Sequence, residues 1–187
     1  RAHNDLTLRV PALLPGPGEA LQLDAVEAAS RIEADIVYID PPYNQHSYMG
    51  NYHVWESLVR WDKPESYGIA NKRMECKEYK SDFNSKRRIR DGLRAVFAAV
   101  RCKHLLLSFN NEGHVDRDEM TALLGEKGHV GVVAVDFKRY VGAQIGIHSP
   151  NGEKVGRVSH LRNKEYFFIV SERRDTVDRV VQALESS

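Results

Sequence analysis

The sequence predicts a single α/β domain over residues 1–187, with a mostly parallel sheet that ends in an antiparallel strand or hairpin. Short apolar runs alternate with amphipathic helical segments along the chain, which is the order expected of a parallel sheet covered by helices. The runs at 36–39 and 105–107 are apolar throughout, as in strands that are buried on both faces. A Ser-Pro-Asn-Gly turn at 149–152 separates two later strand-like runs and predicts a hairpin.

The first elements predict a parallel crossover. A strand is expected over 20–23, a helix over 25–33 with Asp24 as its N-cap, and a second strand over 35–39. Strand, helix and strand in this order form a right-handed crossover. Asp24 and Asp40 are then both expected at the carboxyl edge of the sheet, where ligands bind in open α/β folds. For Asp24, a capping role and a ligand role are both open.

Residues 44–90 interrupt this alternation and are predicted to be an insertion that closes over the sheet edge and grips a nucleic acid. Aromatic side chains are interleaved there with amides and histidines and, further on, with lysines and arginines. This mixture suits stacking on bases and contact with phosphates. Val54, Leu58 and Trp61 share one helical face, which predicts that part of the segment packs into the core.

The remaining segments complete the predicted sheet and its covering helices. Helices are expected over 85–101, 119–126 and 177–184, and strands over 104–109, 130–137 and 166–170. The first of these helices carries five apolar residues on one face: Ile89, Leu93, Val96, Phe97 and Val100. Residues 141–147 and 155–161 are expected to pair as the arms of the hairpin, which carries several basic side chains.

The net charge of +1 is unevenly distributed along the chain. Residues 1–40 hold three basic groups against seven acids, whereas residues 72–103 hold eleven against four and residues 138–164 hold six against one. Such a pattern favours a polyanionic partner that touches only some faces, although ordinary solvated surface is the alternative for any single charge.

Cysteine usage and hydropathy indicate the environment in which the protein is expected to occur. Cys76 and Cys102 form neither a CxxC motif nor a zinc pattern, so a reduced, intracellular environment and no metal site are expected. No apolar run is long enough to cross a membrane, and no secretory signal opens the sequence.

Asp40, Pro41, Pro42 and Tyr43 follow the strand at 35–39 and are suited to presenting a planar amine to an electrophile. The amine of a purine is a poor nucleophile because its lone pair is delocalised into the ring. A carboxylate and a rigid carbonyl, that of Pro41, can accept its two hydrogens and favour a tetrahedral nitrogen. Tyr43 can stack on the base, which must be flipped out of a duplex to be reached.

This motif resembles the catalytic motif of the amino-directed DNA methyltransferases. With aspartate at its first position, it is similar to the form that suggests the adenine-N6 enzymes. Segments 44–48 and 51–56 resemble the stretch that follows the motif in bacterial DNA adenine methylases, and 108–113 and 138–165 contain segments similar to later motifs. The resemblance covers most of residues 20–171. It implies a Rossmann-like class I methyltransferase sheet, S-adenosylmethionine as methyl donor, DNA as substrate, and a cytoplasmic, nucleoid-associated enzyme of restriction-modification or epigenetic marking.

The resemblance also assigns roles to individual residues. Asp40, Pro41, Pro42 and Tyr43 are implied to be catalytic, and Asp24 and Asp40 to border the cofactor. Asn110 and Glu112 would border the base or cofactor pocket, although a turn-capping role is the alternative for Asn110. The residues implied to contact the substrate or the DNA are Asn44, Tyr48, Tyr52, His53, Asn110, Lys138, Arg139, Lys154 and Arg157.

The sequence lacks the glycine-rich motif with which this family holds the methionine end of its cofactor. Gly16 and Gly18 do not supply it, because they precede a predicted strand, whereas a phosphate- or nucleotide-binding glycine loop follows one. The sheet is therefore expected to be incomplete in its N-terminal half, with a missing segment or a partner chain completing the cofactor site. The alternatives are a non-catalytic DNA-binding fragment or subunit, or an enzyme that methylates cytosine, RNA or a protein amide.

Overall fold

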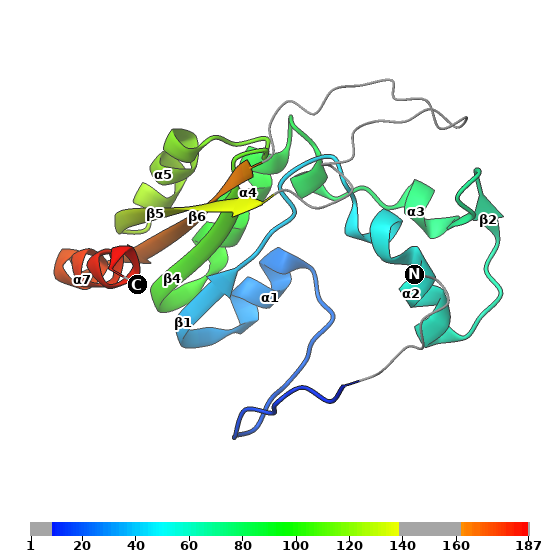
Figure 1. Cartoon of the computed structure of the whole chain (residues 1–187), viewed down its shortest axis with the longest axis horizontal. Coiled ribbons are helices and arrows are strands. Elements are labelled where there is room, and N and C mark those ends of the chain that lie inside the picture. The colour runs from blue at the N-terminus through cyan, green and yellow to red at the C-terminus, as the bar shows by residue number, and fades with distance from the viewer. Residues whose placement is uncertain (1–8, 139–161, 187) are drawn as a thin grey trace.

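A computed structural model describes residues 9–138 and 162–186 and has a mixed four-stranded sheet at its centre (Figure 1). The strands lie in the order β1-β4-β6-β5, namely Glu33–Ile39, Arg101–Asn110, Arg162–Ser171 and His129–Lys138. β1 pairs with β4 in parallel, whereas β6 is antiparallel to both β4 and β5. The α/β class is confirmed. Of the described strands, β1, β4 and β5 run in the same direction and β6, the last in the chain, runs opposite to them, as expected of a mostly parallel sheet with a terminal antiparallel strand.

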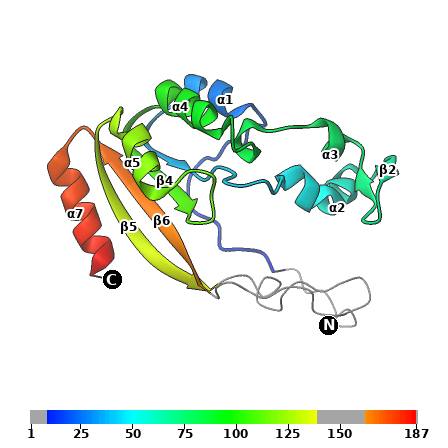
Figure 2. The ribbon, with the colours of Figure 1, turned by 90° about the horizontal axis from the view of Figure 1, so that it is seen from above.

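Helices lie on both faces of this sheet, but they cover them unequally. α1 (Ala25–Arg31), α4 (Ile89–Ala99) and α5 (Arg117–Gly125) lie on one side, and α7 (Arg174–Glu185) lies on the other (Figure 2). α7 packs on β5 and β6. Gly131 permits this close packing, since a Cβ there would lie within 2.6 Å of a methyl group of Val177.

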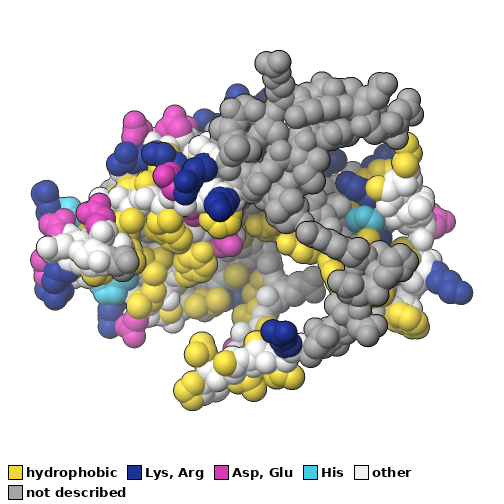
Figure 3. Space-filling model, viewed as in Figure 1, with side chains coloured by type: hydrophobic (Ala, Val, Ile, Leu, Met, Phe, Trp, Pro, Cys, Tyr) yellow, Lys and Arg dark blue, Asp and Glu magenta, His cyan; other side chains and the backbone are white. Residues whose placement is uncertain are grey.

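The side of the sheet that carries α7 exposes a broad apolar surface, which we call the open face. Figure 3 shows hydrophobic side chains gathered over the sheet beside α7. Ile36, Tyr38, Val135, Phe167 and Leu184 are all more than a third exposed there. Tyr38, Phe167 and Leu184 line a hollow of about 400 Å³ on this face.

The expectation that β1 is buried on both faces is therefore wrong. Val37 and Ile39 pack against the core, but Ile36 and Tyr38 on the opposite side are 59% and 58% exposed. The sheet topology gives two reasons for this exposure. Within 9–138 and 162–186, β1 has β4 as its one strand neighbour, and α7 lies too far along the sheet to cover it.

Residues 20–23 do not form the predicted strand, so the crossover expected at the start of the chain is absent from the described structure. These residues have no strand partner to satisfy their backbone groups. Asp24 instead caps α1, and its Oδ1 accepts from the backbone N–H of Val26 at 2.9 Å. The expected placement of Asp24 at the end of a strand is thus wrong, whereas its capping role is confirmed.

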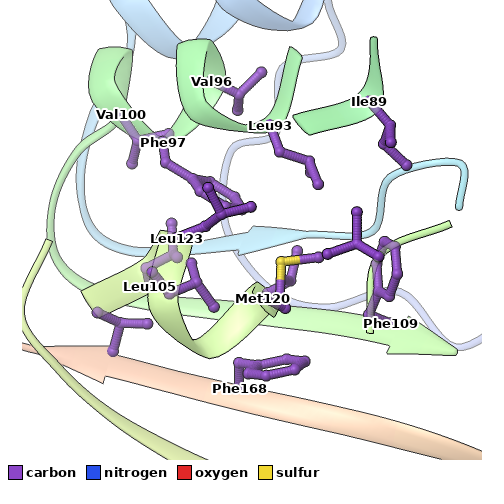
Figure 4. Packing of buried hydrophobic residues seen from close by; sticks show 14 residues of the cluster. Ile89, Leu93, Val96, Phe97, Val100, Leu105, Phe109, Met120, Leu123 and Phe168 are labelled. Atoms are coloured by element: carbon purple, nitrogen blue, oxygen red, sulfur yellow. The ribbon is translucent and has the colours of Figure 1, made fainter. Parts of the chain in front are cut away.

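The core lies between the sheet and α4 and α5, as predicted from the periodicity of α4 (Figure 4). Ile89, Leu93 and Phe97 recur at helical spacing and are at most 2% exposed. They pack in one cluster with Leu107 of β4 and Phe168 of β6. Each such side chain contributes about 1.5–3 kcal/mol through removal from water.

The segment between β1 and α4 lies to one side of the sheet (Figures 1 and 2). It contains α2 (Tyr48–Arg60), β2 (Ser66–Tyr67), β3 (Lys72–Arg73), α3 (Glu75–Glu78) and a 3-10 turn over Asp82–Asn84. α2 has no buried residue. Val54, Leu58 and Trp61 are 55%, 51% and 84% exposed, so the prediction that they pack into the core is wrong.

A buried arginine holds this segment together in place of an apolar core. The guanidinium of Arg73 donates to both oxygens of Asp62, at 2.6 and 2.8 Å, and to both oxygens of Glu75, at 2.9 and 3.1 Å. It also donates to the hydroxyl of Ser57 on α2 at 3.2 Å. All five guanidinium N–H groups are thus used, and these bonds raise the pKa of Arg73.

Most later elements agree with the sequence. The expected helices at 85–101, 119–126 and 177–184 correspond to α4, α5 and α7, with ends that differ by a few residues. The hairpin arms at 141–147 and 155–161 lie outside the described residues. Across the part of the chain that the structure describes, no helix is long and apolar enough to cross a membrane.

Candidate active site

Asp40 lies at the carboxyl end of β1, where Pro41 and Pro42 end the strand. The hydroxyl of Ser108 donates to Oδ1 of Asp40 at 3.0 Å, and the hydroxyl of Tyr38 lies 2.8 Å from that of Ser108. Ser108 is only 5% exposed, whereas Asp40 is exposed. An accessible carboxylate is thus tied to the interior of the sheet.

Tyr43 is held beside this carboxylate by β4 and the turn that follows it. Its ring meets the edge of Phe109 at 5.9 Å between centroids, and its carbonyl accepts from the N–H of His114 at 2.8 Å. Burial raises the pKa of the Tyr43 hydroxyl, and the nearby charges of Glu165, Glu112 and Asp40 raise it further. Tyr43 therefore remains a neutral ring at physiological pH, which suits stacking on a base.

Polar side chains from β4 and β6 form the next part of the site. Asn110 at the end of β4 donates to a carboxylate oxygen of Glu165 at 3.1 Å, and its own oxygen accepts from the N–H of Glu112. Asn163 donates to Glu112 at 2.8 Å. Asn110 therefore holds the turn, as in the capping alternative, and also reaches the group of carboxylates around Tyr43.

Glu165 has a perturbed ionisation in this arrangement. Burial is the main cause that raises the pKa of Glu165, the hydrogen bond from Asn110 opposes it, and the charge of Asp40 adds to it. The carboxylates of Asp40 and Glu165 come from the two strands that flank β4, and Glu165 ionises less readily than usual.

A larger cavity of about 700 Å³ runs between the start of α1 and α2. It brings together Asp24, Tyr48, Tyr52 and His53, four of the residues that the sequence singled out. The rings of Tyr48 and Tyr52 meet edge to face at 6.0 Å. Burial raises the pKa of Tyr48, and the nearby charge of Asp40 adds to this shift.

A second cavity of about 340 Å³ lies between α1, β1 and α4 and extends to Asp40, Pro41 and Pro42. Its walls are largely alanine, valine and isoleucine side chains together with Phe83. Such walls can pack against an apolar or aromatic group but offer few partners to a charged one.

The other predicted contact residues are less closely associated with the site. Asn44 stabilises its own turn by accepting from the N–H of His46 at 3.0 Å. Lys138 is exposed at the end of β5. Arg139, Lys154 and Arg157 lie outside the described residues.

Many basic side chains of the stretch 72–103 are engaged in contacts within the protein, although the charge of this stretch suggested a polyanionic partner. Six of its eleven basic groups are engaged by carboxylates or by a backbone carbonyl: Arg73, Arg88, Arg90, Arg94, Arg101 and Lys103. A polyanion would therefore meet a smaller free charge on this segment than its net balance implies.

Several site residues were not identified as such from the sequence. Tyr38 and Ser108 come from two strands and meet only in the fold, and Glu165 comes from a third strand and accepts from Asn110. Asn84 donates to the carbonyls of Asn44 and His46 and so fixes the loop after the motif. The polar Ser108 directly after the apolar run 105–107 is a signal that could have indicated this residue, whereas the sequence around Glu165 and Asn84 offers no comparable signal.

Among the residues that the structure describes, no group of three or more histidine, cysteine or acidic side chains could hold a metal ion. Cys76 and Cys102 are free thiols, and Cys76 is buried. The described residues of the site supply carboxylates, hydroxyls, amides and aromatic rings.

Comparison with known proteins places this arrangement within a class of DNA-modifying enzymes. The family model described as D12 class N6 adenine-specific DNA methyltransferase matches residues 1–123. The chain belongs to this family, and the family resemblance seen in the sequence is confirmed. No solved structure matches the chain.

Individual relatives carry the same class of name. Modification methylase StsI of Streptococcus sanguinis is 31% identical to the chain over 171 residues. The matched region covers 89% of this chain and 26% of that protein. It is 32% identical over 122 residues to modification methylase LlaI of Lactococcus lactis subsp. lactis, covering 65% of this chain and 19% of that protein. The type II methyltransferase M.NlaIII of Neisseria lactamica is 28% identical to the chain over 123 residues. This match covers 65% of this chain and 36% of that protein. The chain thus spans only about a quarter of the first of these relatives.

Gly113→Ala is expected to disturb the site through Phe109. A Cβ at this position would lie 3.0 Å from Cζ of Phe109 and 3.1 Å from the carbonyl oxygen of Asn110. Because Phe109 is buried and supports Tyr43, we expect a loss of about 1–3 kcal/mol in the free energy of unfolding. Gly125→Ala is the matched control, since nothing lies within 4 Å of a Cβ there. Equal thermal midpoints for both variants would contradict this packing.

Glu165→Gln is expected to change how stability depends on pH. The pKa of Glu165 is raised above its ordinary value of 4.5, so the folded protein retains this proton to higher pH than the unfolded chain. The wild-type protein therefore loses stability as pH rises from the ordinary value through the raised one. Glutamine keeps an oxygen for Asn110 and does not ionise, so the variant should become relatively more stable across that interval. A stability difference that is constant with pH in urea titrations would refute the shift.

Proposed function

We propose that this chain is the base-activating portion of an enzyme that methylates the exocyclic amine of adenine in DNA. The observation that carries the proposal is the accessible carboxylate of Asp40, held at the end of β1 beside Pro41 and the ring of Tyr43. Family membership supports it, and the names of the relatives favour a role in restriction-modification.

In the proposed mechanism, Asp40 and the carbonyl of Pro41 accept hydrogen bonds from the two hydrogens of the amine. These bonds would draw the nitrogen toward tetrahedral geometry and free its lone pair for in-line attack on a methyl group, with the thioether of the donor as leaving group and release of one proton from the methylated amine. The proline pair fixes the direction of the carbonyl, and Tyr43 stacks on the flipped base. No covalent bond forms between the enzyme and the base.

S-adenosylmethionine is the proposed methyl donor, and it supplies an electrophilic methyl group when bound. The aromatic and acidic lining of the 700 Å³ cavity is compatible with its nucleoside, since carboxylates accept from ribose hydroxyls and aromatic rings pack on adenine. Asp24, Tyr48 and Tyr52 are the residues proposed to hold that part. The glycine-rich motif for its methionine end is not among the residues of this sequence.

We further propose that additional polypeptide, either a preceding segment or a partner chain, completes the sheet and the cofactor site. The free edge of β1 and the apolar open face support this, since exposed apolar surfaces of this kind mark interaction sites. The described strands would then be one half of a Rossmann-like class I sheet. DNA with a flipped adenine is the proposed substrate, and the cytoplasm, at the nucleoid, is the proposed location.

Hydrogen exchange on β1 tests the proposed completion of the sheet. The backbone amides of 33–39 form two alternating sets. One set points toward β4, and the other points away from β4, toward the edge of the described sheet. In the complete protein we expect both sets to exchange slowly, because each would have a strand partner. Rapid exchange of the set that faces away from β4 would show that the edge stays free.

Methyl transfer by the complete protein tests the proposed activity. With radiolabelled S-adenosylmethionine, label should enter duplex DNA and not RNA or protein. Label in RNA or protein would overturn the substrate. Tight, salt-sensitive DNA binding without any transfer would instead favour the non-catalytic alternative.

A further inference from the structure

We propose that Ser108 and Tyr38 position the carboxylate of Asp40, and that they determine which of its two oxygens receives the substrate amine. This inference rests on the proposed function, because it concerns the same carboxylate. It assigns a role to two hydroxyls that lie behind the catalytic motif and do not themselves reach the base.

The hydrogen bonds in this group have a defined direction. A serine hydroxyl has one hydrogen, and that of Ser108 points to Oδ1 of Asp40 at 3.0 Å. The 2.8 Å contact between the two hydroxyls must then be donated by Tyr38. The chain therefore runs from Tyr38 to Ser108 to the carboxylate, and each bond strengthens the next because the final acceptor is charged.

The sheet explains why these three side chains meet. Ile39 of β1 is in register with Leu107 of β4, so Asp40 and Ser108 occupy the next position along the two strands. Tyr38 lies two residues before Asp40 and hence on the same side of the strand. The arrangement thus follows from the parallel pairing of β1 with β4.

Ser108 supplies the rigidity that Asp40 lacks. It is 5% exposed and lies in a strand that is paired on both sides, with β1 and with β6. Asp40 lies beyond the end of β1, where the prolines fix the backbone but not the side chain. The hydroxyl of Ser108 therefore links the accessible carboxylate to an interior strand of the sheet.

The consequence for the reaction is a choice between oxygens. With Oδ1 occupied by Ser108, Oδ2 is left to accept from the amine, and the carboxylate plane is fixed. Without Ser108 the carboxylate can rotate, and the amine is held less often in the geometry for attack. Neither hydroxyl is proposed to contact the DNA or the methyl donor, so the effect should fall on kcat and not on KM.

Four variants of the complete protein test this role. Ser108→Ala should lower kcat about 10- to 100-fold with KM for DNA unchanged, because the carboxylate is misoriented. Ser108→Thr retains the hydroxyl and should restore most of the activity. Tyr38→Phe should have a smaller effect. The double variant should be no slower than Ser108→Ala alone, because Tyr38 acts through Ser108.

Ser171→Ala is the matched control for these measurements. Ser171 is 4% exposed, and its hydroxyl bonds to the ring of His104 near the other end of β4. Loss of this hydroxyl should leave kcat unchanged. Two results would overturn the proposal while the wild-type protein still methylates adenine: an unchanged kcat for Ser108→Ala, or effects of Ser108→Ala and Tyr38→Phe that multiply. A wild-type protein without transfer to adenine would instead refute the proposed function.

Discussion

Asp40→Ala in the complete protein is expected to lower methyl transfer to DNA by about 1,000-fold or more, because it removes an acceptor that acts on charge developing in the transition state. The side chain is accessible and is tied to the core by one hydrogen bond from Ser108, so the fold should tolerate its loss. DNA binding should change little. Single-turnover transfer of labelled methyl groups measures the effect directly.

Asp35→Ala is the control for that variant. Asp35 is an acid on the same strand, but it lies toward the other end, where it pairs with Lys103 at 2.6 Å. Its side chain is 77% exposed, and its loss should leave the rate of methyl transfer unchanged. If Asp40→Ala transferred methyl groups as fast as Asp35→Ala, the proposed mechanism would be wrong.

Phe168→Ala is expected to give the largest loss of stability, about 3–5 kcal/mol in the free energy of unfolding. Phe168 has no exposed surface and is the largest of the fully buried side chains in the cluster between the sheet and α4 and α5. Removal of its ring leaves a cavity that the surrounding strands cannot close. Urea unfolding followed by circular dichroism measures the change.

The neighbouring Phe167 provides a matched control for this prediction. It points to the opposite side of the same strand and is 37% exposed on the open face. Phe167→Ala should therefore cost clearly less than Phe168→Ala. Equal losses for the two variants would mean that the core does not lie on the side of the sheet described above.

The sequence predicted the elements whose cause is local. Helix α4 was found from the spacing of Ile89, Leu93 and Phe97, all of which are buried. The strand that became β4 was found from its continuous apolar run, and it is paired on both sides. In both cases a pattern within a few residues decides the structure.

Predictions that depended on distant partners failed. The apolar residues of β1 suggested burial on both faces, but burial depends on which neighbours cover a strand. The apolar face of α2 likewise suggested core packing, whereas the buried Arg73 holds that segment through ion pairs. Neither outcome can be read from periodicity alone.

The candidate site also contains residues that a local motif predicts and residues that only distant contacts bring together. Asp40 and Tyr43 could be predicted as site residues because their motif is contiguous in the sequence. Ser108 lies 68 residues from Asp40, and Glu165 lies 55 residues from its partner Asn110. These contacts arise from strand order, which a single sequence determines only after the sheet is assembled.

The identity of the methylated nucleoside tests the central claim most directly. Duplex DNA modified by the complete protein can be digested to nucleosides and analysed by mass spectrometry. We expect N6-methyladenine, and we expect it to be absent when Asp40 is replaced by alanine. N4-methylcytosine in its place, or N6-methyladenine formed equally well without Asp40, would contradict this claim.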